Sequence, residues 1–487
     1  MTPMAMHVLL ALTLGLSLQQ PGAPVPAQAP VQVHSMRPAP AVHLANGIKI
    51  GEVTDRSAIV WVRLTAAPER NVEGLPWPDG ADALPEGRAL GDMVDSAPGA
   101  AGKVRLTWWP EGDGEARRST AWAAVDPDRD HTHQFLVTEG LAPGQRYRLL
   151  VEGQGAGGGA CRLEGSLRTA PEPGAASPGR FTVVTGQSYL RRDDPERGHR
   201  IYARMLALDP DFFVHTGDVV YHDKPGPFAK STALARYKWN RIYAMPLQRA
   251  FHARVPSWFM TDDHDVLKND CWPGQRYGDL SWDEGLAIYR EQTPTGPRPY
   301  RRVRWGKDLE VWFVEGREFR SPNRMDDGPE KSIWGAEQKA WFKETFAASD
   351  ATFRVLVSST PIVGPDRSSK KDNHANAAFR HEGDELRAFL ASQPNAYVIC
   401  GDRHWQYVSE DPASGVREYS CGPTTDKHAG GFSQKSRSDA HRYLKVCGGF
   451  LEVSLEYEDG APSLAFRHRA VDGSLNHEDR RSVTGGR

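Results

Sequence analysis

The chain of 487 residues has little cysteine and no CxxC spacing that would indicate a zinc site. Its five cysteines are an odd number, so at least one thiol is unpaired. Cys400 and Cys421 could form a disulfide in an oxidising compartment, and two buried structural thiols are the equal alternative.

A strong net charge is also absent. Lys and Arg number 60 and Asp and Glu 62, giving a formal net charge of −2. This balance gives no sign of a nucleic-acid partner or an anionic membrane, so we expect a small-molecule partner. The length exceeds the usual size of one domain, which favours two domains, and there is no internal repeat.

The N-terminal stretch has one apolar run, from Val8 to Leu18, with no charged side chain before it. The run is too short to cross a bilayer and resembles the apolar part of a secretory signal. We expect a signal peptide over residues 1–29 and a linker rich in Pro and Ala over 30–45. A secreted or periplasmic location follows, with no transmembrane segment after signal removal; a frayed N-terminus is the alternative.

Short alternating runs over residues 46–172 predict a small β-sandwich, for example Ile59, Trp61 and Arg63 in SAIVWVRLT. The segment Val72 to Gly102 is rich in Gly, Pro and Ala and is predicted to be a long inserted loop. The stretch GLAPGQRYRLLVEG resembles a strand pair of a fibronectin type III domain. We therefore expect such a domain over 46–172, followed by a boundary rich in proline.

From residue 180 onward, apolar strands alternate with helical patterns, which predicts a layered α/β domain over 180–475. Helices are expected over 198–208, 336–347 and 382–390. The final alternating strands are expected to form an antiparallel edge or a second sheet.

Four apolar runs of this region end in turns rich in carboxylate, histidine or arginine: PDFFVHTGDVVY (210–221), WFMTDDHDV (258–266), VWFVEGREFR (311–320) and YVICGDRHW (397–405). Ligands of open α/β sheets bind beyond the carboxyl ends of the strands. Asp218, Asp263, Asp402 and His404 therefore predict one metal site, since so many carboxylates need a cation to converge. Taken singly, such a turn is more often a helix cap or a solvated acidic turn than a metal ligand.

The ligand types do not identify which metal is bound. Oxygen-rich ligation suits Ca²⁺, Mg²⁺ or Mn²⁺, whereas a histidine with a tyrosine phenolate suits Fe³⁺. Two metals would hold both the attacking and the leaving oxygen of a phosphoryl transfer.

The motifs GDVVY, DDHD, EGREFRSPN and GDRHW together resemble those of PhoD-like alkaline phosphatases and phosphodiesterases, within the calcineurin-like metallophosphatases. The resemblance covers about Asn46 to His468. It implies a four-layer α/β/β/α domain with a dinuclear site, preceded by the fibronectin-like domain. It also implies hydrolysis of small phosphate esters by a metal-activated water, with no Ser or Cys nucleophile.

The resemblance assigns roles to residues by position. Asp218 would bridge two metals, with Tyr221 and His404 on the first, Asp263 and Asp402 on the second, and Asn269 as a weaker candidate. His264 would lie near the substrate and stabilise charge or protonate the leaving group. Further candidates are Arg317 and Arg403 for catalysis, and Gln187, Arg320, Lys427 and His428 for substrate binding.

One position departs from the family pattern, which commonly has Cys before Gln187 as an iron ligand. This chain has Gly186 there, which offers no side-chain donor. Gln187 or a water could fill the position, the metal could be a harder ion, or activity could be lower. We expect Ca²⁺ to be found more readily than stoichiometric iron, with Fe³⁺ or Mn²⁺ as alternatives.

The arginines and the function itself each have a competing interpretation. Arg317 and Arg320 suit bidentate phosphate recognition, but pairing with a buried acid such as Glu315 is equally expected, and Arg403 has the same ambiguity. The alternative functions are a phosphodiesterase acting on phospholipid or wall-polymer diesters, and a binding protein with a degraded metal site.

Overall fold

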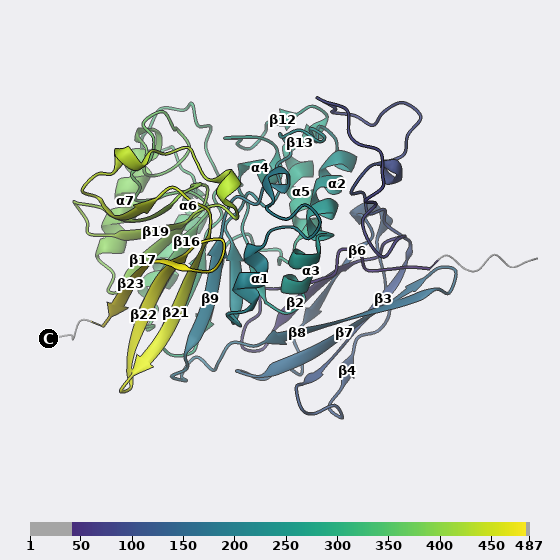
Figure 1. The fold of residues 1–487 in the computed structure, drawn as a ribbon. Coiled ribbons are helices and arrows are strands. Elements are labelled where there is room, and N and C mark those ends of the chain that lie inside the picture. Colours follow the sequence, from purple (N-terminus) through teal and green to yellow (C-terminus); the bar gives the residue numbers. More distant parts are fainter. Residues whose placement is uncertain (1–40, 484–487) are drawn as a thin grey trace, which may run out of the picture. The chain divides into compact units, whose positions relative to one another are not determined.

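Residues 41–483 are described by the computed structural model shown in Figure 1. The predicted signal peptide and most of the predicted linker lie outside these residues, so export stays a prediction. Val42 and Leu44, which were assigned to the linker, are buried and pack in a hydrophobic core, so the ordered chain begins earlier than predicted. Within residues 41–483, no helix is long and apolar enough to cross a membrane.

The largest sheet has nine strands and carries two of the predicted strand ends. The parallel strands β9, β10 and β11 lie at its centre. In spatial order the strands are β23 (Leu475–Ser482), β22 (Ala461–Arg469), β21 (Phe450–Glu458), β9 (Gly179–Val184), β10 (Phe212–His215), β11 (Ser257–Phe259), β1 (Ile48–Gly51), β2 (Ala58–Arg63) and β6 (Thr132–Val137). The C-terminal strands β21 and β22 form the antiparallel part that the sequence predicts.

The second sheet has seven strands and carries the other two strand ends, on β15 and β17. Strands β15, β16, β17 and β19 run parallel. In spatial order the strands are β14 (Arg301–Trp305), β15 (Leu309–Phe313), β16 (Phe353–Ser358), β17 (Ala396–Cys400), β19 (Arg417–Cys421), β18 (Gln406–Glu410) and β20 (His441–Lys445).

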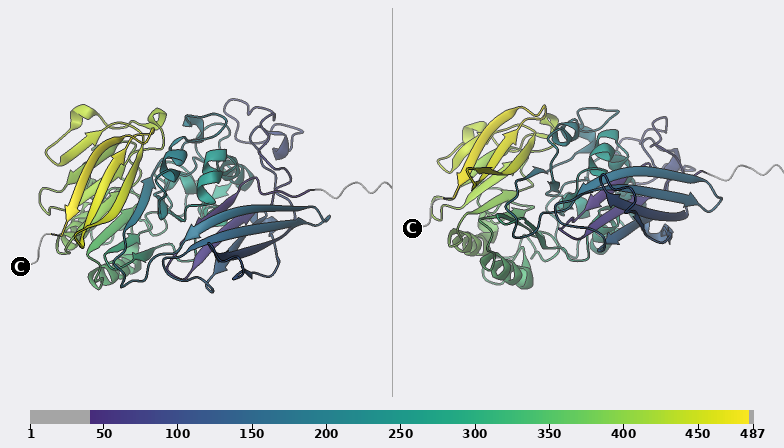
Figure 2. Two further views of the ribbon diagram at one scale, coloured as in Figure 1. Left: turned by 60° about the horizontal axis from the view of Figure 1, so that its bottom comes forward. Right: turned by 90° about the horizontal axis from the view of Figure 1, so that it is seen from below.

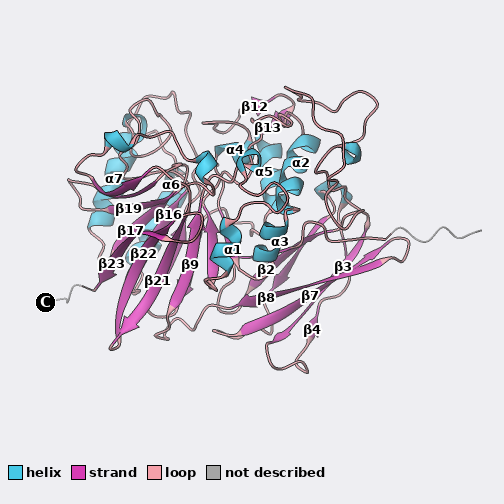
Figure 3. Ribbon diagram, in the orientation of Figure 1, coloured by secondary structure: helices cyan, strands magenta, loops and turns pink. Residues whose placement is uncertain are grey.

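Within residues 41–483, seven α-helices lie around these sheets; Figure 3 shows the helices in cyan. They are α1 (Ile201–Leu206), α2 (Thr232–Tyr243), α3 (Pro246–His252), α4 (Asp263–Val266), α5 (Trp282–Gln292), α6 (Gly335–Ala347) and α7 (Arg380–Ala391). The helices α1, α6 and α7 correspond to the three predicted ones.

The apolar cores show how the layers follow one another. Strands of both large sheets share one core, to which Val214 of β10 and Val355 of β16 contribute. On the outer face of the nine-stranded sheet, Phe213 packs with α1 and α3; on the outer face of the seven-stranded sheet, Leu356 packs with α6 and α7. The result is a mixed α/β fold, as predicted, with successive helix, sheet, sheet and helix layers (Figure 2).

The N-terminal region adds a second pair of β-layers. Strands β1, β2 and β6 extend the nine-stranded sheet, because β1 pairs with β11. They share a core with a further sheet formed by β3 (Gly102–Pro110), β4 (Arg118–Ser119), β5 (Ala123–Ala124), β7 (Arg146–Gly155) and β8 (Ala160–Arg168). The assignment of 46–172 as a fibronectin type III domain stays a prediction.

Two smaller features complete the fold. The predicted loop from Val72 to Gly102 packs onto α2, where Trp77 donates a hydrogen bond to the Tyr237 hydroxyl at 2.9 Å. A two-stranded ribbon, β12 (Arg276–Tyr277) and β13 (Leu280–Ser281), precedes α5. All five cysteines are free. Of the two alternatives for Cys400 and Cys421, the structure therefore favours two buried thiols over a disulfide.

Candidate metal centre

The same Gly-Asp turn follows β10 and β17. Asp218 and Asp402 both have φ of 59°, the left-handed region that aspartate tolerates better than most residues. A Cβ at Gly217 would lie 2.4 Å from the Cβ of Asp262, and one at Gly401 would lie 2.5 Å from a hydroxyl in the turn after β10. Glycine is therefore required at both turns because they pack tightly against neighbouring strand ends.

These turns bring acidic side chains together. Ligand atoms of Asp218, Asp263 and His264 lie within 4.8 Å of one another, and those of Asp218, Asp262 and Asp402 meet the same limit. Asp218 belongs to both groups and so lies between two possible cation positions. Asp263 thus shares one group with Asp218, and Asp402 and Asp262 share the other; the metal-binding roles of these residues stay predictions.

Two of these carboxylates, Asp218 and Asp262, are not fully compensated by positive charge from the protein, whereas His264 and Arg317 help to lower the pKa of Asp263. Asp218 Oδ1 and Asp262 Oδ2 are buried and have no hydrogen-bond partner among the described residues. Burial raises the pKa of Asp218 to about 7, with Asp263 and Asp402 adding to the shift and His264 opposing it. Burial also raises the pKa of Asp262 well above its usual range, although Arg317 opposes that shift. The donor set therefore fits divalent cations.

A further carboxylate, Asp265, holds the backbone of this centre. It accepts hydrogen bonds from the N–H groups of Asp218 at 2.8 Å, Val219 at 2.7 Å, Val220 at 3.0 Å and Asp262 at 2.9 Å. Burial, with the charge of Asp218, raises the pKa of Asp265 to about 8. Asp265 thus ties the turn after β10 to the turn after β11.

Tyr221 and His404 lie on one side of Asp218. The Tyr221 hydroxyl donates to Asp218 Oδ2 at 2.9 Å, and His404 Nε2 lies 3.6 Å from the same oxygen. The Tyr221 hydroxyl is 3.4 Å from His404 Nε2. Burial lowers the pKa of His404 to about 3, so its imidazole is neutral and able to bind a cation.

His264 has a different partner. Its Nδ1 lies 2.5 Å from Asp223 Oδ1, and its ring centroid lies 4.5 Å from that of Tyr221. Burial alone would lower the pKa of His264, but Asp263, Asp218 and Asp223 outweigh it and raise the pKa to about 9. His264 therefore carries a proton in the metal-free protein at neutral pH.

Arg403 is fully buried and surrounded by carboxylates. It pairs with Asp402, lies 3.2 Å from Asp366 Oδ2 and lies 3.8 Å from Asp372 Oδ2. Asp366 and Asp372 belong to the segment between β16 and α7. Arg403 therefore offers positive charge both to Asp402 of the second Gly-Asp turn and to two acids of this segment.

The two other candidate arginines are also held by the protein. Arg317 donates from Nε to Asp262 Oδ1 at 2.7 Å, and its backbone N–H donates to Glu315 at 2.7 Å. The predicted pairing with a buried acid is thus present, but the side-chain partner is Asp262. Arg320 is buried and donates to the backbone carbonyls of Gly316 at 3.0 Å and Asp372 at 2.6 Å.

The remaining candidates lie around this centre in different ways. Gln187 is buried and hydrogen-bonds to Tyr202 through Oε1, whereas Lys427 is exposed. His428 is buried with its ring centroid 4.0 Å from that of His404. Asn269 donates its backbone N–H to Asp223 at 3.1 Å, so it contacts the partner of His264 instead of the carboxylate groups named above.

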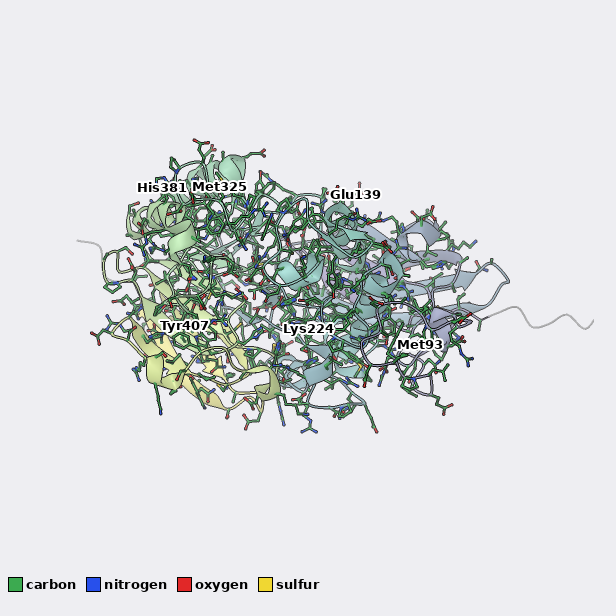
Figure 4. The ribbon with its side chains drawn as sticks, turned by 90° about the horizontal axis from the view of Figure 1, so that it is seen from above. Met93, Glu139, Lys224, Met325, His381 and Tyr407 are labelled. Atoms are coloured by element: carbon green, nitrogen blue, oxygen red, sulfur yellow. The ribbon has the colours of Figure 1, made fainter. Side chains whose placement is uncertain are left out.

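The loop after β10 is held by a buried lysine whose pKa burial lowers well below its usual range. Lys238 of α2 is buried and donates from Nζ to the carbonyl oxygens of Tyr221, His222 and Lys224, the last at 2.6 Å. Figure 4 labels Lys224, which lies between Met93 and Tyr407 in that view.

Sequence reasoning assigned no role to four residues of this centre, which are Asp262, Asp265, Asp223 and Lys238. The first two belong to the DDHD motif, so the motif located them without showing which of its acids face the cations. Asp223 follows the GDVVYH segment closely and offered a weak signal. No pattern marks Lys238, which acts only through backbone carbonyls.

The comparisons with known proteins agree with this architecture. The sequence profile described as PhoD-like phosphatase matches residues 181–447. A search of curated proteins finds no match. A solved structure titled as that of PhoD has a TM-score of 0.69 at 16% identity, covering 91% of this chain and 92% of that one.

A second solved structure is the purple acid phosphatase PPD1 from seeds of yellow lupin (Lupinus luteus). It has a TM-score of 0.62 at 11% identity, covering 91% of this chain and 74% of that one. At these identities both likenesses concern the fold, whereas the profile match spans more than half of the sequence. The chain therefore belongs to the PhoD-like phosphatase family.

Proposed function

We propose that the protein hydrolyses phosphate esters with the help of two cations held around Asp218. The observation that carries the proposal is that Asp218, which has a buried oxygen without a partner, contacts Tyr221 and His404 through Oδ2 and also lies in two groups of converging ligand atoms that contain Asp262, Asp263 and Asp402. Tyr221 and His404 would complete one position, and Asp262, Asp263 and Asp402 the other. Family membership supports the reaction class.

Bound cations supply two things to such a reaction: they neutralise charge on the phosphoryl oxygens and lower the pKa of a water molecule. The protein supplies the geometry. Asp265 fixes the turns that carry Asp218 and Asp262 through four backbone hydrogen bonds. The carboxylates are thus placed before any ligand arrives, which avoids reorganisation during the reaction.

His264 is the proposed proton donor to the leaving oxygen. Asp223 accepts the hydrogen bond from Nδ1, so the other ring nitrogen is left to donate its proton. The high pKa of His264 in the metal-free protein shows that its acidic partners favour the protonated form. Bound cations would oppose that effect and bring the pKa closer to the working pH.

The arginines are proposed to act through the carboxylates. Arg317 orients Asp262, and Arg403 orients Asp402, each through a charge-assisted hydrogen bond. Because both arginines are buried and paired, their proposed role is to keep Asp262 and Asp402 ionised and correctly placed. Direct contact with the substrate is the less favoured role.

Asp218→Asn tests the proposal. We expect the variant to lose hydrolysis roughly 10²- to 10³-fold, since several kcal/mol of charge stabilisation depend on this ligand. Asp459→Asn is a matched control, because Asp459 also has positive φ, of 48°, but lies in the exposed turn between β21 and β22. Equal activity of Asp218→Asn and wild type, with Ca²⁺, Mn²⁺ or iron supplied, would refute the catalytic proposal.

The type of ester is the second part of the test. Hydrolysis of p-nitrophenyl phosphate compared with its bis ester separates a phosphomonoesterase from a phosphodiesterase. If neither compound reacts with any of these metals, a non-catalytic binding role becomes the better explanation.

A further inference from the structure

We propose that Lys370 binds the phosphoryl group of the substrate and thereby makes the protein selective for phosphate monoesters over diesters. The inference rests on the proposed function, because it names the substrate class of the same site. Lys370 belongs to the segment between β16 and α7, which also contains Asp366 and Asp372.

The ion pair of Lys370 and Asp270 joins this segment to the loop after α4. Nζ of Lys370 donates a hydrogen bond to Asp270 Oδ1 at 2.5 Å. The backbone N–H of Asp270 donates in turn to Asp263 Oδ2 at 2.5 Å. Lys370 is therefore separated from Asp263, a proposed metal ligand, by a single residue.

On its other side, Lys370 approaches the second Gly-Asp turn. Nζ also donates to Asp372 Oδ2 at 3.3 Å, and this oxygen lies 3.8 Å from the Arg403 guanidinium that pairs with Asp402. Burial alone would lower the pKa of Lys370, but nearby acids, led by Asp402, outweigh it and raise the pKa. The ammonium group thus lies between the two acids Asp263 and Asp402, which both belong to the proposed second cation position.

The ammonium group of Lys370 has a donor available and can be reached by a ligand. An ammonium group carries three N–H donors, and two of them serve Asp270 and Asp372. Within residues 41–483 the third has no hydrogen-bond partner. The Lys370 side chain is 16% exposed.

The arginines of the centre differ from Lys370 in this respect. Arg317, Arg320 and Arg403 are buried, and acids or backbone carbonyls hold their guanidinium groups. A ligand can therefore approach Lys370, but it cannot approach these arginines without displacing their partners.

The number of charged oxygens on the substrate then decides its class. A phosphate monoester has three non-bridging oxygens and a diester has two. Two cations can neutralise two of these oxygens, so a monoester keeps one that needs a further positive group. A lysine ammonium is suited to this task as a compact point charge. In a diester the same position carries a second alcohol group, which gains nothing from the ammonium.

Orthophosphate binding tests this inference without turnover. We would load the purified full-length protein with Mn²⁺ and measure orthophosphate binding by calorimetry. Lys370→Met should weaken binding roughly 10- to 100-fold, because it removes one charge-assisted hydrogen bond. Lys371→Met is the matched control, since Lys371 is the exposed neighbour and has no ion pair among the described residues, and it should bind like wild type.

The selectivity is measured by kcat/KM for p-nitrophenyl phosphate and for its bis ester. Lys370→Met should lower the value for the monoester roughly 10- to 100-fold and that for the diester less than about threefold. Equal losses for the two esters would mean that Lys370 supports the metal centre as a whole, and the selectivity would then be overturned.

Asp270→Asn separates phosphate binding from a structural role of the ion pair. Asp270 has φ of 56°, which asparagine tolerates, and its backbone N–H can still donate to Asp263. If Lys370 only held Asp270 in place, the two substitutions would weaken orthophosphate binding equally. We expect Asp270→Asn to bind orthophosphate at least as tightly as wild type.

Lys370→Gln, with the same measurements, guards against a folding defect of Lys370→Met, which thermal melting in chelator would reveal. Wild-type orthophosphate affinity in a folded Lys370 variant overturns the inference. If wild type hydrolyses neither ester while its orthophosphate binding depends on Lys370, the proposed function fails and Lys370 remains a phosphate-binding residue.

Discussion

The two Gly-Asp turns have the same backbone but opposite electrostatic surroundings. Asp402 pairs with Arg403, and a network of further acids surrounds that arginine. Asp218 has no arginine or lysine partner within the described residues; the side chains around it are Tyr221, His264, His404 and neighbouring carboxylates. Asp402 thus has an arginine of the protein as its counter-ion. Asp218 has none, and a bound cation would have to supply the compensating charge. One motif therefore carries a carboxylate with an arginine partner in one turn and a carboxylate without such a partner in the other.

Arg403→Met should break the neutralised turn and have the largest effect on stability. It leaves buried acids, including Asp402 and Asp366, without their partner, which costs roughly 3–5 kcal/mol of unfolding free energy. Urea unfolding of the metal-free protein measures this. Arg442→Met is the control, since Arg442 pairs with Glu410 at 2.7 Å on the surface and should cost less than about 1 kcal/mol. A loss as small as that of the control would show that Asp402 does not need Arg403.

The pH dependence of the unfolding free energy should differ between Asp218→Asn and the wild type. The pKa of Asp218 is about 7 in the folded state and about 4 in the unfolded chain. Since the raised pKa favours the protonated folded state, its stabilising contribution is lost as pH rises from about 4 to 7.

The metal-free wild type should lose about 1.4 kcal/mol per pH unit relative to Asp218→Asn in this window. Urea unfolding of both proteins in chelator at several pH values measures the difference. Parallel curves would contradict the buried, uncompensated state of Asp218.

The same contrast extends to the two histidines near these turns. His264 has a carboxylate on Nδ1 and a raised pKa, whereas burial lowers the pKa of His404. A proton donor needs the first environment and a metal ligand the second.

Asp223→Asn should therefore affect the protonation of His264. Without the carboxylate, the pKa of His264 falls, so the alkaline limb of the kcat profile should move to lower pH. We also expect kcat to fall roughly tenfold, as for other residues that orient a functional histidine. The pH dependence of kcat measures both effects. An unchanged alkaline limb would mean that His264 is not the group that titrates there.

The sequence located the strand ends because their chemistry is local. An apolar run followed by Gly-Asp predicts both a buried strand and a turn with a carboxylate, and β10 and β17 have this form. The choice between Asp262 and Asp263 could not be predicted, because it depends on how the turn after β11 is oriented by Asp265 and Arg317.

Long-range pairings were beyond the sequence patterns. Asp223 and His264 are separated by 41 positions, and Arg403 meets acids from a segment without helical or strand periodicity. Likewise, the pairing of β1 with β11 joins residues about 200 positions apart in the chain, so the N-terminal strands were expected to be a separate sandwich. Such contacts depend on tertiary packing, which no local pattern encodes.

Lys238 has a consequence for how the enzyme would acquire its ions. Its Nζ donates hydrogen bonds to the carbonyls of Tyr221 and Lys224 from inside the loop, while burial lowers the pKa of this lysine well below its usual range. Because these hydrogen bonds involve no bound ion, we expect the loop to keep its shape when ions leave, so exchange of one metal for another would not require it to refold. The protein would then be able to bind a new metal ion from its surroundings without first refolding this loop.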